Sequence, residues 1–128
     1  MKNTAGEWLK QAIYDMDTAD VMFASGKYIY TIFMCHLSSE KALKGLFRQR
    51  FNSVPPKSHN LIYFIERLEI KIDSDIQNYI AMLNNVSVPT RYPENLEKMI
   101  KVFTEERTGE ILKRGKEVLS WIENEYMK

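Results

Sequence analysis

A histidine and a glutamate stand one helical turn apart in an otherwise apolar row of this sequence. The polar pair is His36 and Glu40, and the rest of the row is Ile29, Phe33, Leu43 and Phe47. Burying an unpaired carboxylate costs several kcal/mol, so Glu40 needs a partner or an opening to water. Two interpretations follow. Either His36 or a cation from another helix satisfies Glu40 inside the protein, or the pair lines a polar pocket or the centre of a dimer interface.

The same pair raises the question of a metal site. Histidine and glutamate can share a metal in helical bundles, but di-iron bundles need further Glu-x-x-His motifs on other helices. The only other histidine, His59, has no glutamate three residues before it. We therefore expect neither a metal site nor a cofactor. His59 follows Ser58, where it either orients a loop at a helix start or serves as a ligand or proton-transfer residue near neutral pH.

Basic and aromatic residues offer a second kind of chemistry. Residues 40–67 contain six lysines and arginines against two acids, and Lys41 and Lys44 belong to a helical row that we expect to be basic and solvated. Lys57 lies in a proline loop. Arg91 and Tyr92 are predicted on a loop between Pro89 and Pro93, where arginine can hold a phosphate and tyrosine can stack on a base. The alternative is a structural arginine bonding helix-end carbonyls beside a tyrosine that fills the core.

Helical periodicity predicts the elements that carry these residues. A first helix is expected from about Ala5 to Phe23, ending at Ser25-Gly26, and a second, central one from Tyr28 to Arg50. A third starts at Ser58 as N-cap, and a fourth opens with a Ser74–Gln77 capping box and closes at Asn84-Asn85 and Pro89. Residues 96–103 allow one or two turns, and a last helix starts near Thr104. The prediction is an all-α, five-helix, up-and-down antiparallel bundle forming one domain over residues 1–128.

Composition excludes several classes of protein. With 128 residues and 45% hydrophobic residues the chain can fill one core. No apolar run approaches the ~20 residues that cross a bilayer, and the start of the chain lacks the apolar stretch of a signal peptide. Cys35 is alone, which favours the cytoplasm. The net charge of +1 argues against broad electrostatic binding to long nucleic acid, and no glycine-rich phosphate loop or nucleophile elbow is present.

A family resemblance adds to this interpretation. The stretch GKYIYTIFMCHLSSEKALKGLF (26–47) resembles the signature of HEPN domains, a family of nucleotide- and RNA-associated helical domains. Nearly the whole chain agrees in order and spacing, through Trp8, Ala12 and Ala19, then Lys57, His59 and Leu61 in and after the proline loop, and finally Arg91-Tyr92-Pro93. The resemblance implies a five-helix bundle, related to the substrate-binding helical domains of nucleotidyltransferases. It also implies a homodimer, nucleotide binding and a small nucleotidyltransferase partner in systems resembling toxin–antitoxin pairs.

One branch of that family comprises metal-independent ribonucleases, which use an arginine followed after four to six residues by a histidine, brought together across the dimer. Here the eligible positions after Arg91 hold Leu96, Glu97 and Lys98. Histidine suits the proton transfers of such a reaction, so its absence disfavours nuclease activity.

The leading hypothesis is a non-catalytic, homodimeric HEPN-type module that binds a nucleotide or a nucleotidyltransferase partner. No association with a membrane is expected. Its predicted recognition residues are His36, Glu40, Lys41, Lys44, Lys57, His59, Arg91 and Tyr92. The alternatives are a ribonuclease toxin that acts on RNA with a displaced active site, and a pure dimerisation module.

Overall fold

The computed structural model describes residues 4–128, and in this part of the chain six helices follow one another without a strand. They are α1 (Ala5–Ala24), α2 (Tyr28–Phe51), α3 (Leu61–Leu68), α4 (Ser74–Arg91), α5 (Leu96–Val102) and α6 (Glu105–Glu125). The predicted all-α class is confirmed. The helix number is one higher than predicted because residues 96–102 form a helix of their own.

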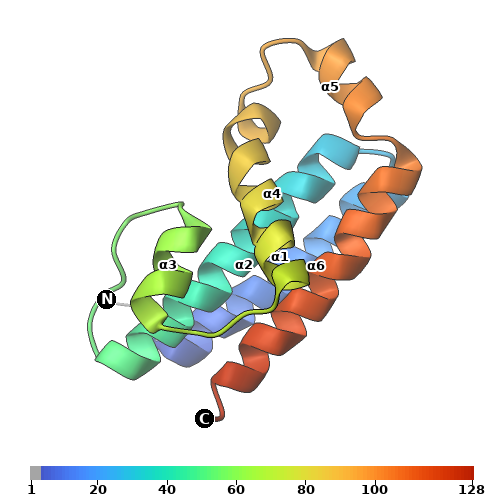
Figure 1. Cartoon of the computed structure of the whole chain (residues 1–128). Helices are drawn as coiled ribbons and strands as arrows, with labels where there is room; N and C mark the ends of the chain where they lie inside the picture. Colours follow the sequence, from blue (N-terminus) through green and yellow to red (C-terminus); the bar gives the residue numbers. More distant parts are fainter. Residues whose placement is uncertain (1–3) are drawn as a thin grey trace.

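The central helix is α2, as expected from the sequence. It packs against α1, α3, α4, α5 and α6 (Figure 1). Small residues let α1 approach closely, and the Ser38 hydroxyl donates a hydrogen bond of 2.7 Å to the Ala12 carbonyl. Residues on α2 are therefore held by neighbours on most sides, which makes this helix a rigid support for a site.

The four long helices alternate in direction. Figure 1 shows α1 and α4 running one way and α2 and α6 the other. The short α3 does not span the bundle, so the neighbours α2 and α6 run in parallel. Consistent with this, Gln49 near the end of α2 donates a hydrogen bond of 3.0 Å to the Tyr126 carbonyl just after α6. The up-and-down arrangement is thus built from four spanning helices, with α5 capping the end opposite the C-terminus.

The predicted start of the third helix was wrong by two residues. Its N-cap is Asn60, whose side-chain oxygen accepts from the backbone N–H groups of Ile62 and Tyr63. Ser58 instead accepts from the N–H of Asn60. Asn84 of α4 bonds both Asn60 and the N–H of Leu61. This long-range anchor fixes where α3 begins, and it could not be found from local capping patterns.

The fourth helix also begins differently from the prediction. Its N-cap is Asp73, whose carboxylate accepts from the N–H of Ile76 at 2.8 Å, and Ser74 is the first helical residue. The predicted Ser74–Gln77 capping box is therefore wrong. A carboxylate suits the positive end of a helix better than a hydroxyl does, because it also interacts favourably with the helix dipole.

This correction gives a testable prediction. Asp73→Ala should lower the free energy of unfolding by about 1 kcal/mol, the usual effect of losing an N-cap. Ser74→Ala should change it by much less, since Ser74 is not the cap. Urea unfolding of the two variants provides the comparison, and an equal or larger loss for Ser74→Ala would restore the sequence-based assignment.

The end of α4 is the largest departure from the prediction. The helix continues through Asn84-Asn85 and Pro89 to Arg91. Pro89 removes the helical donor for the carbonyl of Asn85, which is an exposed residue. Beyond it, the Thr90 hydroxyl donates to the Val86 carbonyl, and the Tyr92 N–H donates to the Val88 carbonyl. Arg91 thus lies on a helix and not on the predicted loop.

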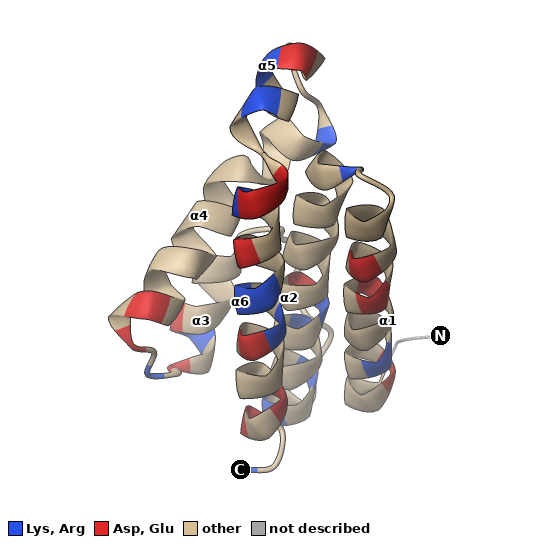
Figure 2. Cartoon of the chain, turned by 90° about the vertical axis from the view of Figure 1, so that its right-hand side faces the viewer, with Lys and Arg blue, Asp and Glu red and all other residues tan. Residues whose placement is uncertain are grey.

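The last helix agrees with the sequence. Thr104 is its N-cap and accepts from the Arg107 N–H. Its buried residues include Ile111, Leu112, Gly115, Val118, Leu119 and Ile122. The sequence also places Tyr126 on this stripe, but Tyr126 is only partly buried and is the C-cap. In Figure 2 charged residues of both signs follow one another along α6, whereas α4 carries few.

Candidate functional site

Glu40, on the inner face of α2, has two partners at hydrogen-bond distance. The residue is only 3% exposed. The Lys44 Nζ lies 3.1 Å from Oε2, and the His59 Nδ1 lies 2.8 Å from Oε1. The need for a partner, argued from the sequence, is therefore met by a lysine of the same helix together with a histidine of the loop before α3. We call the group His36, Glu40, Lys44 and His59 the Glu40 cluster.

Lys44 is the clearest correction among the predicted site residues. We expected it on a solvated row, but it is 7% exposed. Its ammonium lies 5.9 Å from the ring centroids of Trp8 and Phe64, which cover it from α1 and α3. Aromatic faces attract a cation, and Glu40 balances its charge. Lys44 therefore lies in the interior beside Glu40 and not on a solvated row.

Lys41, the other lysine of that row, pairs with a different helix. Its Nζ lies 3.0 Å from Asp15 Oδ2 of α1. Asp15 is buried, and this burial raises the pKa of its carboxyl, while the hydrogen bond and charge of Lys41 lower it. Sequence analysis missed Asp15 because it lies outside the apolar stripe of α1. The pair joins α1 to α2 and leaves Lys41 unavailable to the Glu40 cluster.

His36 is completely buried, and neither ring nitrogen has a hydrogen-bond partner among the residues that the structure describes. Its Nδ1 is 3.9 Å from Glu40 Oε1, beyond hydrogen-bond distance. Burial is the main cause that lowers its pKa, with Glu40 opposing this effect and the Arg91 charge adding to it. Burial thus favours the neutral form of His36, and a buried imidazole with no partner at hydrogen-bond distance is rare in protein interiors.

The lowered pKa of His36 predicts that mild acid destabilises the fold. The unfolded chain takes up this proton near the ordinary histidine pKa of about 6.5, whereas the folded chain does so only at lower pH. Between these pKa values the unfolded state binds more protons, so the free energy of unfolding falls as the pH falls through the window.

Urea unfolding at neutral pH and again below about pH 6 measures this loss. A His36→Gln variant should lose less stability on acidification than the natural protein, because glutamine does not titrate. If both proteins lost the same free energy between the two conditions, the buried neutral state of His36 would be refuted.

Arg91, the last residue of α4, borders the Glu40 cluster. Its guanidinium lies 4.9 Å from the ring centroid of Phe33, one turn before His36 on α2. The Nε atom is buried without a hydrogen-bond partner among the described residues, and the charge is close enough to lower the pKa of His36. One of the two roles predicted for Arg91 was to bond helix-end carbonyls, and the Nε atom forms no such bond. Chain segments around residues 36, 59 and 91 therefore meet at one place.

Comparison with known proteins identifies the fold and the family. The sequence matches the HEPN domain over residues 5–125. The chain belongs to the HEPN domain family. The crystal structure of TT1696 from Thermus thermophilus is similar, with a TM-score of 0.80, 23% identity, and coverage of 94% of this chain and 97% of that one. ST0689, an archaeal HEPN homologue, gives a TM-score of 0.76 and 23% identity over 97% and 98% of the two chains. No curated protein matches.

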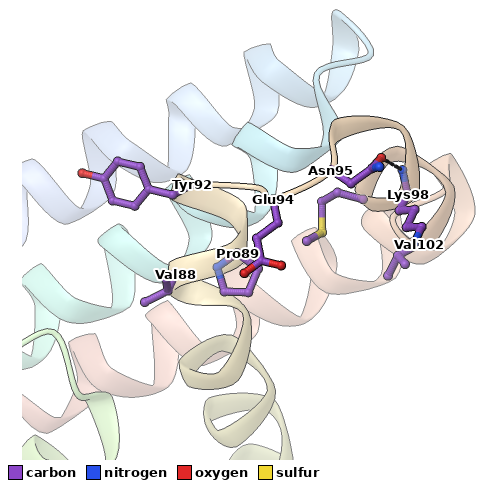
Figure 3. A pocket seen from close by; sticks show the side chains of 8 residues that line it. Val88, Pro89, Tyr92, Glu94, Asn95, Lys98 and Val102 are labelled. Atoms are coloured by element: carbon purple, nitrogen blue, oxygen red, sulfur yellow. Dashed lines mark hydrogen bonds between the residues drawn. The ribbon is translucent and has the colours of Figure 1, made fainter.

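Tyr92 faces a different part of this HEPN domain from Arg91. It is 71% exposed and lines a groove of about 470 Å³ between the end of α4 and α5, together with Val88, Pro89, Glu94, Asn95, Lys98, Met99 and Val102. In Figure 3 its ring points away from Lys98 and Val102 on α5. Because it is so exposed, the alternative that Tyr92 fills the core is wrong.

Three further observations concern Lys57, possible metal ligands and membrane spans. Lys57 is exposed in the loop before α3. Within residues 4–128 no three histidine, cysteine, aspartate or glutamate side chains are grouped to hold a metal ion. Over the same residues, no helix combines the length and apolar character that a bilayer span requires.

Proposed function

We propose that this HEPN chain is a non-catalytic, homodimeric module of the cytoplasm that binds a nucleotide at Arg91 and the Glu40 cluster. The observation that carries the proposal is the meeting of an arginine and a buried, unpaired histidine on one rigid helix pair. A guanidinium forms two parallel hydrogen bonds with a phosphate. A neutral imidazole can both donate to and accept from a base or ribose.

Of the proposed binding residues, His59 and Arg91 reach the surface, since the His59 side chain is 59% exposed and Arg91 is half-buried. Both influence the pKa of His36. We therefore propose that a ligand touching both would lie close to His36. Lys57, two residues before His59, adds positive charge to the same loop, which favours an anionic ligand such as a nucleotide.

Calorimetric titration with nucleoside mono- and triphosphates tests the proposal. Arg91→Gln should weaken binding roughly tenfold or more, the effect of losing a charged hydrogen bond. Arg107→Gln is a matched control, because the Arg107 guanidinium also lies over an aromatic ring, 5.1 Å from the Phe103 centroid, but at the start of α6. No binding of any nucleotide, or equal losses in the two variants, would rule out this site.

We also propose that the groove between α4 and α5 is where a second copy or a nucleotidyltransferase partner docks, in a system resembling a toxin–antitoxin pair. The support is a group of exposed apolar side chains at this end of the bundle, comprising Val88, Tyr92, Leu96, Ile100 and Val102. Such patches mark interaction sites in soluble proteins.

Light scattering of the chain alone distinguishes the two occupants. A dimer that Tyr92→Ser and Ile100→Ser convert to a monomer supports the second copy. A monomer at high concentration would exclude homodimerisation and leave the protein partner as the proposal. If both substitutions leave the dimer unchanged, the dimer interface lies elsewhere. The chain would then be a dimerisation module that uses another face.

A second candidate function is that of a metal-independent ribonuclease. The specific observation in its favour is that the Arg91 charge is close enough to lower the pKa of His36, although the sequence lacks the expected spacing. This candidate predicts RNA cleavage without added metal and its loss in Arg91→Gln and His59→Asn. Intact RNA after prolonged incubation would eliminate it.

A further inference from the structure

The six basic residues of segment 40–67 differ in whether a carboxylate balances their charge. Three of them each have a carboxylate oxygen within 3.1 Å, namely Lys41, Lys44 and Arg50. Within residues 4–128, no carboxylate oxygen lies within 4.0 Å of the other three, which are Arg48, Lys57 and Arg67. The unbalanced positive charge of this segment is therefore carried by these three residues.

Arg67 differs from the other two because aromatic rings surround it. It lies on α3, which packs beside the C-terminal half of α2 (Figure 1). Its guanidinium carbon is 5.5 Å from the ring centroid of Phe47 and 5.8 Å from those of Phe51 and Tyr63. Aromatic faces attract a cation, and Nη1 also donates a hydrogen bond of 2.9 Å to the Tyr63 hydroxyl. The guanidinium is therefore held in place although no carboxylate holds it.

The same place presents an exposed aromatic ring. Phe51, at the end of α2, is 44% exposed, and its ring centroid is 4.6 Å from that of the buried Phe47. Arg67 is exposed as well. A guanidinium has five N–H donors, and among the described residues only Tyr63 accepts from one of them. We call Phe51, Tyr63 and Arg67 the Arg67 platform. It offers free donors and an apolar ring side by side, both supported from below.

We infer that the Arg67 platform binds a peptide segment of a partner protein that carries a carboxylate beside a large apolar side chain. The planar fork of a guanidinium matches a carboxylate with two parallel hydrogen bonds. The Phe51 ring provides the contact for the apolar side chain. The platform shares no residue with the Glu40 cluster, with Arg91 or with the groove between α4 and α5, so the inference goes beyond the proposed function.

The charges around Arg67 favour a peptide over a nucleic acid. Glu66 and Glu69 are exposed on either side of Arg67 in the sequence, and like charges repel. A nucleic acid brings a phosphate with every nucleotide, so its neighbouring phosphates would meet these carboxylates. A peptide needs to supply only one negative charge, and the net charge of the whole chain is only +1.

Nuclear magnetic resonance titration with a short peptide tests the inference in the free protein. The probe is the tetrapeptide Gly-Glu-Phe-Gly, acetylated and amidated so that its glutamate is the only charge. We expect saturable shifts of the Arg67 Nε–H and Phe51 ring resonances. Replacing the glutamate of the probe with glutamine should weaken binding about tenfold, the effect of losing a charged hydrogen bond. Equal binding of the glutamine probe, or no shift at the platform, would overturn the inference.

Variants of the protein provide the second readout. Arg67→Gln should weaken binding of the probe about tenfold, and Arg67→Lys should lose nearly as much, because lysine keeps the charge but not the planar fork. Arg107→Gln is the matched control, since Arg107 is also exposed and lies 5.1 Å from one ring centroid, that of Phe103. Circular dichroism verifies that each variant is folded. Equal losses for Arg67→Gln and Arg107→Gln would contradict a specific site.

A single-stranded RNA hexamer distinguishes the other class of ligand. It should shift the Arg67 platform less than the peptide does at equal concentration. Tighter binding of the RNA, with the same loss in Arg67→Gln, would assign the platform to nucleic acid and overturn the peptide partner. Because Arg91 and the Glu40 cluster are untouched in these variants, the result does not depend on the nucleotide titrations.

Discussion

Replacing Glu40 with glutamine is expected to lower the free energy of unfolding by about 3–5 kcal/mol, the usual effect of removing one partner from a buried ion pair. The carboxylate accepts from Lys44 at 3.1 Å and from His59 at 2.8 Å. Without its negative charge, the Lys44 ammonium remains enclosed by Trp8 and Phe64 with no counter-charge. Urea unfolding, followed by circular dichroism, measures the change.

The companion variant separates the lost charge from other effects. Lys44→Met replaces the ammonium with an apolar side chain of similar length, and the double variant Glu40→Gln, Lys44→Met should recover much of the stability that Glu40→Gln alone loses. Buried ion pairs are often replaceable by apolar residues, whereas their separated members are not. A double variant whose loss equals the sum of the two single losses would show that the pair is not coupled.

An exposed ion pair serves as the control. Lys116 Nζ lies 2.6 Å from Asp20 Oδ1, with both side chains about half exposed. Asp20→Asn should change the free energy of unfolding by less than about 1 kcal/mol, because solvent screens such pairs. A loss for Asp20→Asn as large as that for Glu40→Gln would mean that burial is not the cause.

A methyl group added at Gly45 is expected to destabilise the protein by about 1–3 kcal/mol through overpacking. A Cβ at this position would overlap the Tyr126 hydroxyl and lie 2.7 Å from Trp8 Cβ and 3.0 Å from the Ala5 carbonyl oxygen. The Tyr126 hydroxyl donates to the Ala42 carbonyl, so Gly45→Ala must also disturb this bond between the C-terminus and α2. The higher helix propensity of alanine, about 1 kcal/mol, offsets part of the loss.

Gly6→Ala is the matched control, since both glycines lie in helices. The nearest atom to a Cβ at Gly6 is Thr4 Oγ1 at 4.0 Å, which leaves room for the methyl group. This variant should be neutral or more stable, whereas Gly45→Ala should unfold at lower urea concentration. If Gly45→Ala were as stable as Gly6→Ala, the close approach of α1, α2 and Tyr126 would be wrong.

Local signals explain why most of the fold could be predicted from the sequence. The turn at Ser25-Gly26 separates α1 from α2 as expected, with Gly26 at a φ of 76° that glycine adopts readily. The expected start of the last helix near Thr104 was also correct, since Thr104 is its N-cap. Errors arose where distant contacts outweigh local preference. Asn84 anchors the start of α3 from another helix, and α4 passes through Pro89 because nearby groups satisfy the backbone.

The candidate site was predicted only in part, for the same reason. The burial of His36 and Glu40 followed from their apolar row, which is a property of one helix. Whether Lys44 faces water or the interior depends on α1 and α3, which contribute Trp8 and Phe64. Arg91 and Tyr92 are adjacent in sequence yet face different surroundings, because a helix turns successive side chains to different sides.

The sequence by itself determined the helices, the burial of a histidine and a glutamate on the second of them, and the resemblance to the HEPN family. These depend on periodicity and residue type within short stretches of chain. Only the tertiary structure decided that Lys44 and His59 share Glu40, that Arg91 joins them and that Tyr92 does not. Those contacts link residues from separate elements, and their energies depend on distance and burial, which are fixed only when the helices pack.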